Sequence, residues 1–271
     1  MSVCAIVVSY RTGKALEACL AALRVAEGLD EIVIADNGNE ADGAAVFDVA
    51  AAADGRIRLL RGQGNIGFAA ACNLAARDAR AEVLAFINPD VILEADAIVR
   101  LNAVLIGAPP PAIVGGDLRD EQGKSERGSR RDRVTLWRAF TSFTGLTRFG
   151  LRDFNRHTDP LPAEPQRVGA ISGALFVMRR EDFARLGGFD EGYFIHVEDL
   201  DLCRRAEDAG MAVLFAPGPH GRHLRSTSDV VPSLVAQHKA RGMARYFKKF
   251  AKGPAERALA IVAGWVLVAT T

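Results

Sequence analysis

The sequence predicts an α/β fold in which a mostly parallel central sheet carries helices on both faces. Two observations favour this fold class. Over residues 1–117, short apolar runs rich in β-branched residues alternate with segments of helical periodicity, and such alternation implies a parallel, doubly covered sheet. Apolar residues make up 49% of the 271 residues, which is enough material for one large domain or two small ones.

Each element of this first region follows from the spacing of its apolar residues. Val3–Ser9 is a continuous apolar run, typical of a buried parallel strand, whereas Lys14–Leu23 carries apolar residues at helical spacing. Further strands are expected at Glu31–Ala35, Ile57–Leu60, Val83–Ile87 and Ala112–Val114, and further helices at Ala44–Ala53, Phe68–Ala79 and Ala95–Leu105.

Residues 118–165 interrupt the alternation. The segment is highly charged near its start and rich in proline near its end, with a short helix expected at Val134–Phe143. Two interpretations stay open: a lid or acceptor-binding segment, or a disordered insertion. After it, we expect a strand at Ile171–Met178, a short helix at Glu181–Leu186, a helix beginning near Glu198 and a last strand at Met211–Ala216.

Composition limits the function classes. The formal net charge is +1, so no global field attracts nucleic acid. The four cysteines are widely spaced and form no CxxC pair, which indicates reduced thiols and a cytoplasmic location. The chain enters its first strand at Val3 without a basic leader, so no secretory signal is expected.

Residues 229–271 form a separate C-terminal segment that is basic and then apolar. Basic and aromatic residues between Lys239 and Arg257 precede the apolar run Ala258–Ala269, which is too short to span a bilayer. The segment could lie on the anionic inner face of the cytoplasmic membrane. Alternatively, it is a terminal helix packed on the domain with a solvated basic face.

Polar residues follow three of the predicted strands. Ser9-Tyr10, Asp36-Asn37 and Asn88-Pro89-Asp90 each stand where a strand ends. Ligands of open α/β sheets bind at the carboxyl ends of the strands, so these residues are candidate site residues. Turn chemistry alone would also enrich Asp and Asn at these places.

A carboxylate cluster, Glu198-Asp199-Leu200-Asp201, opens the late helix. Helical positions three apart share a face, so Glu198 and Asp201 are expected together while Asp199 points elsewhere. One interpretation is a helix start stabilised by acidic residues. The other is a carboxylate base beside a substrate site.

Taken in order and spacing, these motifs carry a resemblance that covers residues 3–228. The chain resembles the inverting glycosyltransferases of family 2, which have the GT-A fold, and within them a subgroup similar to bacterial rhamnosyltransferases of polysaccharide and cell-wall assembly. The matching pieces are Val7–Tyr10, Ile34–Asn37, Asn65–Asn73, Phe86–Val91, Ser172–Ala174, Gly187–Glu191, Glu198–Arg205 and His223, followed by Ser226 and Ser228.

The resemblance implies a GT-A domain over residues 1–228, with a nucleotide-binding half (1–117), the variable segment (118–165) and an acceptor-binding, catalytic half (166–228). It implies transfer of a sugar, first L-rhamnose from dTDP-rhamnose and next a hexose from a UDP-hexose, to a glycan or lipid-linked oligosaccharide, without a covalent intermediate. A sugar nucleotidyltransferase is an alternative, although only one glycine follows the first strand. A non-catalytic carbohydrate-binding protein is another.

The resemblance also assigns roles to residues. Asp199 is the expected general base, and Glu198 supports it or contacts the acceptor. Asp90 and His223 are the expected ligands of Mg or Mn, with His220 as the alternative histidine. Asn88, which replaces the first Asp of the family's Asp-x-Asp motif, is expected at the ribose or a water.

The remaining carried-over residues form the donor pocket. Asp36 is expected to accept the uracil or thymine N–H, since a carboxylate at a strand end can accept that bond. The others are Ser9 and Tyr10 at the base and ribose, Asn65, Gly67, Phe68 and Asn73 in a donor loop, and Gly173 and Ala174 under the sugar.

Overall fold

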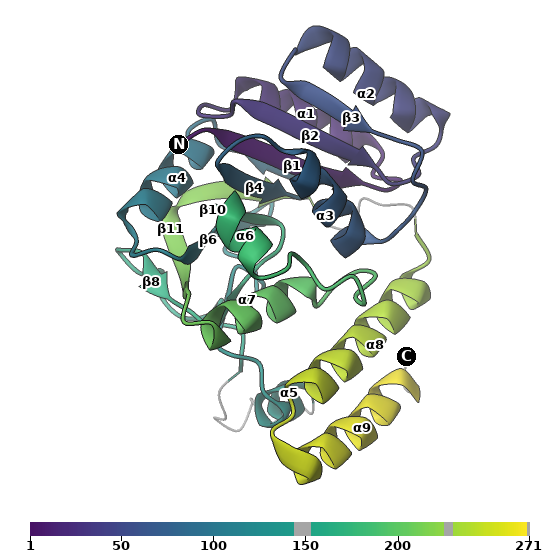
Figure 1. Cartoon of the computed structure of the whole chain (residues 1–271), viewed down its shortest axis with the longest axis vertical. Coiled ribbons are helices and arrows are strands. Elements are labelled where there is room, and N and C mark those ends of the chain that lie inside the picture. Colours follow the sequence, from purple (N-terminus) through teal and green to yellow (C-terminus); the bar gives the residue numbers. More distant parts are fainter. Residues whose placement is uncertain (144–152, 225–229, 270–271) are drawn as a thin grey trace.

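The computed structural model describes residues 1–143, 153–224 and 230–269, and a mixed sheet of nine strands lies at its centre (Figure 1). The strand order is β3-β2-β1-β4-β10-β6-β11-β5, with β8 beside β11. The strands of this sheet are β1 (Val3–Ser9), β2 (Glu31–Asp36), β3 (Ile57–Leu60), β4 (Val83–Ile87), β5 (Val91–Leu93), β6 (Ala112–Arg119), β8 (Gln166–Arg167), β10 (Leu175–Arg179) and β11 (Ala212–His223). A separate ribbon pairs β7 (Arg130–Arg131) with β9 (Ala170–Ile171).

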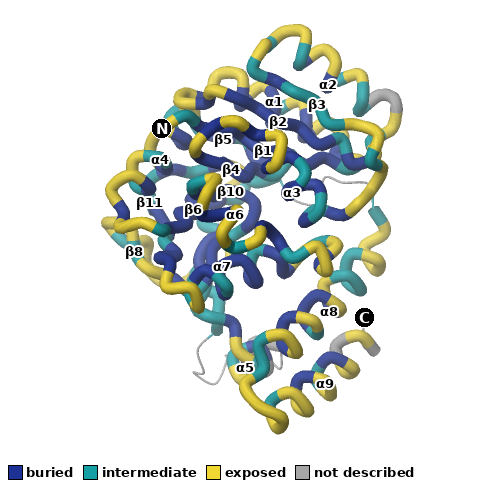
Figure 2. The backbone as a smooth tube through the Cα atoms, in the orientation of Figure 1, coloured by how far each residue is buried: buried dark blue, intermediate teal, exposed yellow. Residues whose placement is uncertain are grey.

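Helices cover both faces of the sheet, as the sequence predicts. They are α1 (Lys14–Val25), α2 (Ala41–Ala53), α3 (Phe68–Asp78), α4 (Ala97–Gly107), α5 (Leu136–Phe143), α6 (Arg180–Arg185), α7 (Glu198–Asp208), α8 (Pro232–Phe250) and α9 (Gly253–Ala269). One core cluster joins the sheet to α1, α2 and α4, and another joins it to α3, α6, α7 and α8. The dark-blue tube in Figure 2 follows the sheet and the inner faces of these helices.

The first half of the sheet is parallel and brings the predicted strand ends together. β3, β2, β1 and β4 all pair in parallel, and Ser9 at the end of β1 is the register partner of Asp36 at the end of β2. The burial of every residue of β1 explains why this strand reads as a continuous apolar run.

The second half of the sheet contains an antiparallel strand, β10, which pairs with both β4 and β6. The single strand expected at Ile171–Met178 is split into β9 and β10. Ile171 lies against the backbone of Gly115, where a side-chain Cβ would come within 2.5 Å, so the chain crosses over β6 before it enters β10. The turn between β9 and β10 places Gly173 and Ala174 beside the end of β4.

The last strand is longer than predicted. β11 continues past Ala216 to His223, with a register shift between Phe215 and His220 that accommodates the two prolines. Similarly, β6 runs beyond Val114 to Arg119. Residues 118–165 contain β7 and α5, the latter where a short helix is expected. Of that segment, residues 144–152 lie outside the described part, as do Ser226 and Ser228.

The C-terminal segment forms a helical hairpin of α8 and α9 (Figure 1). α8 packs on the domain through Met243, Tyr246 and Phe247, which are buried. α9 packs on α8 and exposes Leu259 and Trp265, the latter at 75%. Among the helices of the described residues, none combines the length and apolar character needed to cross a bilayer.

Candidate active site

The ends of β1 and β2 form one corner of the site. Ser9 is fully buried, and its hydroxyl lies 2.9 Å from that of Thr12. Asn39 donates one hydrogen bond to the Ser9 carbonyl (2.9 Å) and another to Asp36 Oδ1 (2.8 Å). The second carboxylate oxygen of Asp36 lies 3.7 Å from Arg61. Asp36 is therefore held in a fixed orientation by the loop that follows β2.

The predicted donor loop is bonded to the segment that precedes α7. Asn65 accepts a hydrogen bond from the Asn37 side chain (3.0 Å), and the N–H of Phe68 donates to the carbonyl of Phe194 (2.7 Å). Gly67 has φ of +85°, and a Cβ there would lie 2.8 Å from the Phe194 carbonyl oxygen. Glycine is required at this position because the two loops approach so closely.

Two other predicted donor-pocket residues have different surroundings. Tyr10 is half-buried, and the Arg11 guanidinium lies 5.6 Å from its ring centroid. Asn73 is buried and donates to the Phe189 carbonyl (2.9 Å) while accepting from the Phe189 N–H (2.8 Å). The side chain of Asn73 thus fixes the loop after α6.

A second group lies where β4 ends and β10 begins. The Asn88 N–H donates to the Ala174 carbonyl (3.0 Å), and the Gly173 N–H donates to Asp199 Oδ2 (3.2 Å). Arg131 donates to the same Asp199 oxygen at 3.1 Å. The buried side-chain oxygen of Asn88 has no hydrogen-bond partner within the part of the chain that the structure describes. The structure therefore joins the predicted base to the turn expected under the sugar.

The two acidic residues that open α7 differ in environment. Glu198 is buried, and this burial, reinforced by the charge of Asp199, raises the pKa of Glu198 to about 8. The buried position of Glu198 therefore favours its protonated, uncharged form, while Asp199 is only partly buried. Val197, the N-cap residue of α7, makes no side-chain capping hydrogen bond, and His196 and Val197 have φ of +65° and +76°. Such left-handed backbone is strained for these residue types and concentrates at functional sites.

Asp201 has a structural role. It is fully buried and lies 2.5 Å from Arg205, one helical turn along α7. Lys249 of α8 lies 2.6 Å from its other oxygen, which also accepts from the Tyr193 hydroxyl. This carboxylate therefore anchors α7 to α8.

The predicted metal ligands converge because β11 pairs with β5. His223 is the register partner of Val91, and its Nε2 lies 3.2 Å from Asp90 Oδ1. Its Nδ1 lies 3.0 Å from Glu126. Burial alone would lower the pKa of His223, but hydrogen bonds and charges from these two carboxylates raise it to about 9. The alternative, His220, lies instead 2.8 Å from Glu94.

Sequence reasoning did not identify Arg131 or Glu126. Both belong to the charged segment that was open to interpretation as an insertion, and their spacing carries no signal for a site. Pairing of β7 with β9 brings Arg131 to Asp199, and the isolated bridge between Arg119 and Ser125 accompanies the approach of Glu126 to His223. Both contacts depend on tertiary structure.

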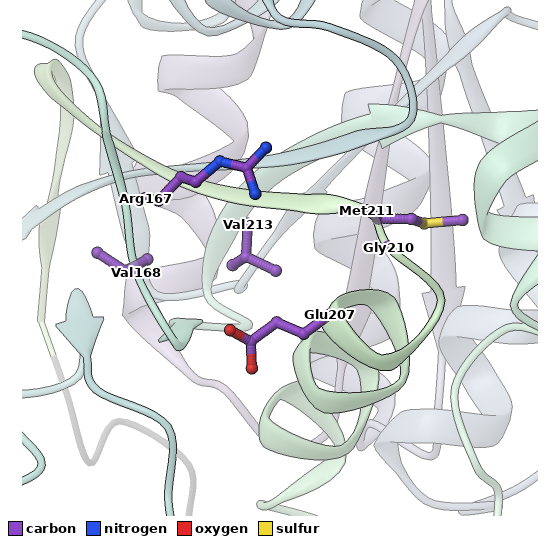
Figure 3. A pocket seen from close by; sticks show the side chains of 6 residues that line it. All are labelled: Arg167, Val168, Glu207, Gly210, Met211 and Val213. Carbon is purple, nitrogen blue, oxygen red and sulfur yellow. The ribbon is translucent and has the colours of Figure 1, made fainter.

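A small pocket of about 140 Å³ lies at the other end of α7 (Figure 3). In this view Val213 lies between Arg167 and Glu207, and the pocket lining contains none of the predicted site residues. The chemistry-bearing side chains gather instead at the carboxyl ends of β1, β2 and β4, as expected for an open α/β sheet.

Comparison with known proteins gives a consistent result. Residues 2–244 match the model of the family described as "Glycosyltransferase like family 2". The chain is 29% identical over 252 residues to the N-acetylglucosaminyl-diphospho-decaprenol L-rhamnosyltransferase of Mycobacterium tuberculosis, covering 87% of this chain and 81% of that protein. It is 28% identical over 148 residues to the rhamnosyltransferase WbbL of Escherichia coli, covering 54% of each.

Solved structures share the fold. GalNAc-T7 with UDP, GalNAc and Mn²⁺ superposes with a TM-score of 0.65 at 18% identity, covering 95% of this chain and 51% of that one. The mannosyltransferase PcManGT of Pyrobaculum calidifontis, in complex with GDP-Man and Mn²⁺, gives 0.62 at 16% identity, covering 99% and 74%. The chain thus spans about half the length of the first of these two structures.

Proposed function

This chain belongs to glycosyltransferase-like family 2, and on that basis we propose that it transfers L-rhamnose from dTDP-rhamnose to a lipid-linked glycan acceptor, with inversion at the anomeric carbon. The name of the mycobacterial relative supports the sugar and the type of acceptor. The observation that carries the proposal is the convergence of Asp199, Gly173 and Asn88 beside the Asp90–His223 pair.

Asp199 acts as the general base in this proposal. A carboxylate offers roughly four lone-pair sites. Three of those sites accept N–H groups, from Arg131, Gly173 and the following Leu200. These bonds fix the carboxylate and leave a site for the acceptor hydroxyl, whose proton passes to Asp199 as its oxygen bonds to the anomeric carbon. The nucleoside diphosphate leaves in the same step.

In this proposal Asp90 and His223 would hold a divalent cation, which would displace the Nε2 proton that His223 shares with Asp90 in this structure. A carboxylate oxygen and an imidazole nitrogen converge there within 3.2 Å, and the unpartnered Asn88 oxygen lies two residues away in sequence. No group of three His, Cys, Asp or Glu side chains among the described residues is arranged to hold a metal ion, so the donor diphosphate would supply further oxygens. A bound Mg or Mn would neutralise charge on the leaving diphosphate.

The nucleotide base is assigned to the corner formed by β1 and β2. Asp36 has Oδ1 occupied by loop N–H groups, whereas Oδ2 has only the ion pair with Arg61 at 3.7 Å and keeps a lone pair for the imide N–H of thymine or uracil. Ser9 and Tyr10 lie on the neighbouring strand end, and Asn65 and Gly67 form the facing loop. This arrangement separates the base end of the donor from the sugar end at Gly173.

We assign the enzyme to the cytoplasmic side of the membrane, with peripheral contact through α9. Its exposed Leu259, Val262 and Val266 lie at helical spacing and form one apolar stripe. In a vesicle co-sedimentation assay, Leu259→Ser with Val262→Ser should release the protein from anionic vesicles. Sedimentation equal to that of the wild type would refute this contact.

The proposed reaction is tested by a donor panel with Mg or Mn: dTDP-rhamnose, UDP-glucose, UDP-galactose and UDP-glucuronate. We expect dTDP-rhamnose to bind most tightly and to be transferred. Asp199→Asn should keep donor binding but lose transfer by about 10²–10⁴-fold, with Asp208→Asn on the same helix as the matched control. Tighter binding and transfer of a UDP-hexose would show that dTDP-rhamnose is not the donor. Turnover of the Asp199→Asn variant within about tenfold of the wild type would exclude Asp199 as the base.

A further inference from the structure

A groove of about 860 Å³ lies between α8 and α9, outside the site described above. Its volume falls in the range that ligand pockets of proteins occupy. Its lining combines cationic side chains with apolar ones: Arg245, Lys248 and Arg257 are among the former, and Ile261, Trp265 and Val268 among the latter. The same groove therefore presents both positive charge and apolar surface.

The groove carries cations that no described carboxylate neutralises. Asp190 lies 2.8 Å from Arg245 and 2.7 Å from Lys249, so those two cations are engaged. Lys248 and Arg257 are exposed and form no ion pair with a residue in the described ranges. Two charges thus remain for an anionic group that enters the groove.

We propose that this groove binds the lipid diphosphate end of the acceptor, with the diphosphate at Lys248 and Arg257 and the isoprenoid chain along Trp265 and Ile261. Lysine and arginine form charge-assisted hydrogen bonds with phosphate oxygens. An amphiphile of this kind matches both linings at once. The proposal rests on the proposed function for the nature of the acceptor.

Binding of a lipid diphosphate in the concave groove is distinct from contact between α9 and a flat bilayer. The stripe of Leu259, Val262 and Val266 points to a different side of α9 from the groove residues Ile261 and Trp265, so one helix serves two surfaces. The bilayer stripe lacks cations among its own residues, whereas the groove combines cations with apolar side chains.

The lining of the groove also contacts α7, the helix that carries Asp199. Lys249 lines it and at the same time contacts Asp201, which lies two residues after Asp199 on α7. Asp190, at the groove, belongs to the loop that leads from α6 to α7. An acceptor lipid in the groove would therefore contact residues that are bonded to α7, the helix that carries Asp199.

The test measures binding of farnesyl diphosphate, a short soluble isoprenoid diphosphate, in vesicle-free buffer with EDTA. Trp137→Phe leaves Trp265 as the remaining tryptophan of the chain, so its fluorescence reports on the groove. We expect a saturable blue shift of emission as the isoprenoid chain covers Trp265. Inorganic diphosphate under the same conditions should bind more weakly and leave the emission unshifted, because it lacks the chain.

Charge reversal locates the binding site. In the Trp137→Phe background, Lys248→Glu with Arg257→Glu should weaken farnesyl diphosphate binding by about tenfold or more, since two charge-assisted contacts become repulsive. The matched control, Arg241→Glu with Lys252→Glu, changes the same net charge on the same hairpin outside the groove lining and should bind as before. Equal affinity in all three proteins, or equal losses in both double variants, would overturn the proposal.

Kinetics separate this inference from the proposed function. With dTDP-rhamnose, the groove variant should raise KM for a lipid-linked acceptor and leave kcat/KM for the same glycan without lipid unchanged. Melting temperatures check that each variant is folded. If the wild type transfers no sugar but still binds farnesyl diphosphate in the groove, the proposed function fails and the lipid site stands. If the groove variant transfers sugar to the lipid-linked acceptor with the same KM as the wild type, the lipid site is excluded and the proposed function stands.

Discussion

Replacement of Glu198 by glutamine isolates the effect of burying a carboxyl group beside the base. Below pH 4.5, Glu198 is protonated in the folded and the unfolded chain alike. Between that pH and about 8, the unfolded chain releases the proton while the folded chain retains it, because burial and the charge of Asp199 raise the folded pKa to about 8. The free energy of unfolding therefore falls as pH rises through this window.

The size of the effect follows from the shift. Each pKa unit corresponds to about 1.4 kcal/mol, so the rise from 4.5 to about 8 corresponds to at most roughly 5 kcal/mol. The glutamine side chain of the Glu198→Gln variant cannot titrate, so the variant should lose this pH dependence. A buried amide that lacks a partner would lower stability by about 1–3 kcal/mol at every pH, which shifts the curve without changing its slope.

The assay is urea-induced unfolding at several pH values from about 5 to about 8, for the wild type and for Glu198→Gln. The difference between the two free energies of unfolding should change steadily in favour of the variant as pH rises. Glu17→Gln, at an exposed position of α1, is the control and should follow the wild type. Parallel curves for wild type and Glu198→Gln would show that Glu198 is not held neutral, and the reasoning would fail.

Three other substitutions test the remaining contacts. Asp90→Ala should abolish the gain in donor affinity on adding Mg or Mn, measured by calorimetry; a normal metal-dependent gain would exclude Asp90 as a ligand. Gly173→Ala places a Cβ 3.1 Å from that of Asp199 and should reduce turnover about tenfold or more while donor binding is kept. The control is Gly55→Ala, whose Cβ meets nothing within 4 Å and which should leave turnover unchanged. Equal kinetics in both would indicate that Asp199 tolerates displacement. Lys249→Met should lower the free energy of unfolding by about 1–3 kcal/mol, because the buried Asp201 loses one donor, and Lys248→Met serves as control; equal stability would show that Arg205 and Tyr193 suffice.

The sequence was most informative where local patterns decide structure. The apolar runs of β1, β2, β3 and β4 are buried in parallel pairing, and their lengths match the prediction closely. The polar residues after them had to meet at one sheet edge, since parallel strands present their carboxyl ends together. Thus Asp36, Asn88 and Asp90 could be proposed as candidate site residues from their positions in the chain alone.

Patterns that extend across a turn were less informative. The apolar run Ile171–Met178 gives no sign that Ser172–Ala174 turns the chain, because either a strand or a turn tolerates Gly173. Likewise, the prolines of residues 217–219 suggest an end to β11, but a bulge lets the strand continue to His223. Without that continuation, His223 could not reach Asp90.

By itself, the sequence determined the α/β class, the parallel half of the sheet and the candidate residues at its edge, because periodicity and strand ends are local properties. Only the tertiary structure decided how the two acids of α7 differ. Adjacent positions of a helix point in directions about 100° apart, so one carboxyl entered the core and the other met Gly173 and Arg131. Long-range packing alone sets such surroundings, and these contacts among residues distant in sequence distinguish the neutral Glu198 from the proposed base, Asp199.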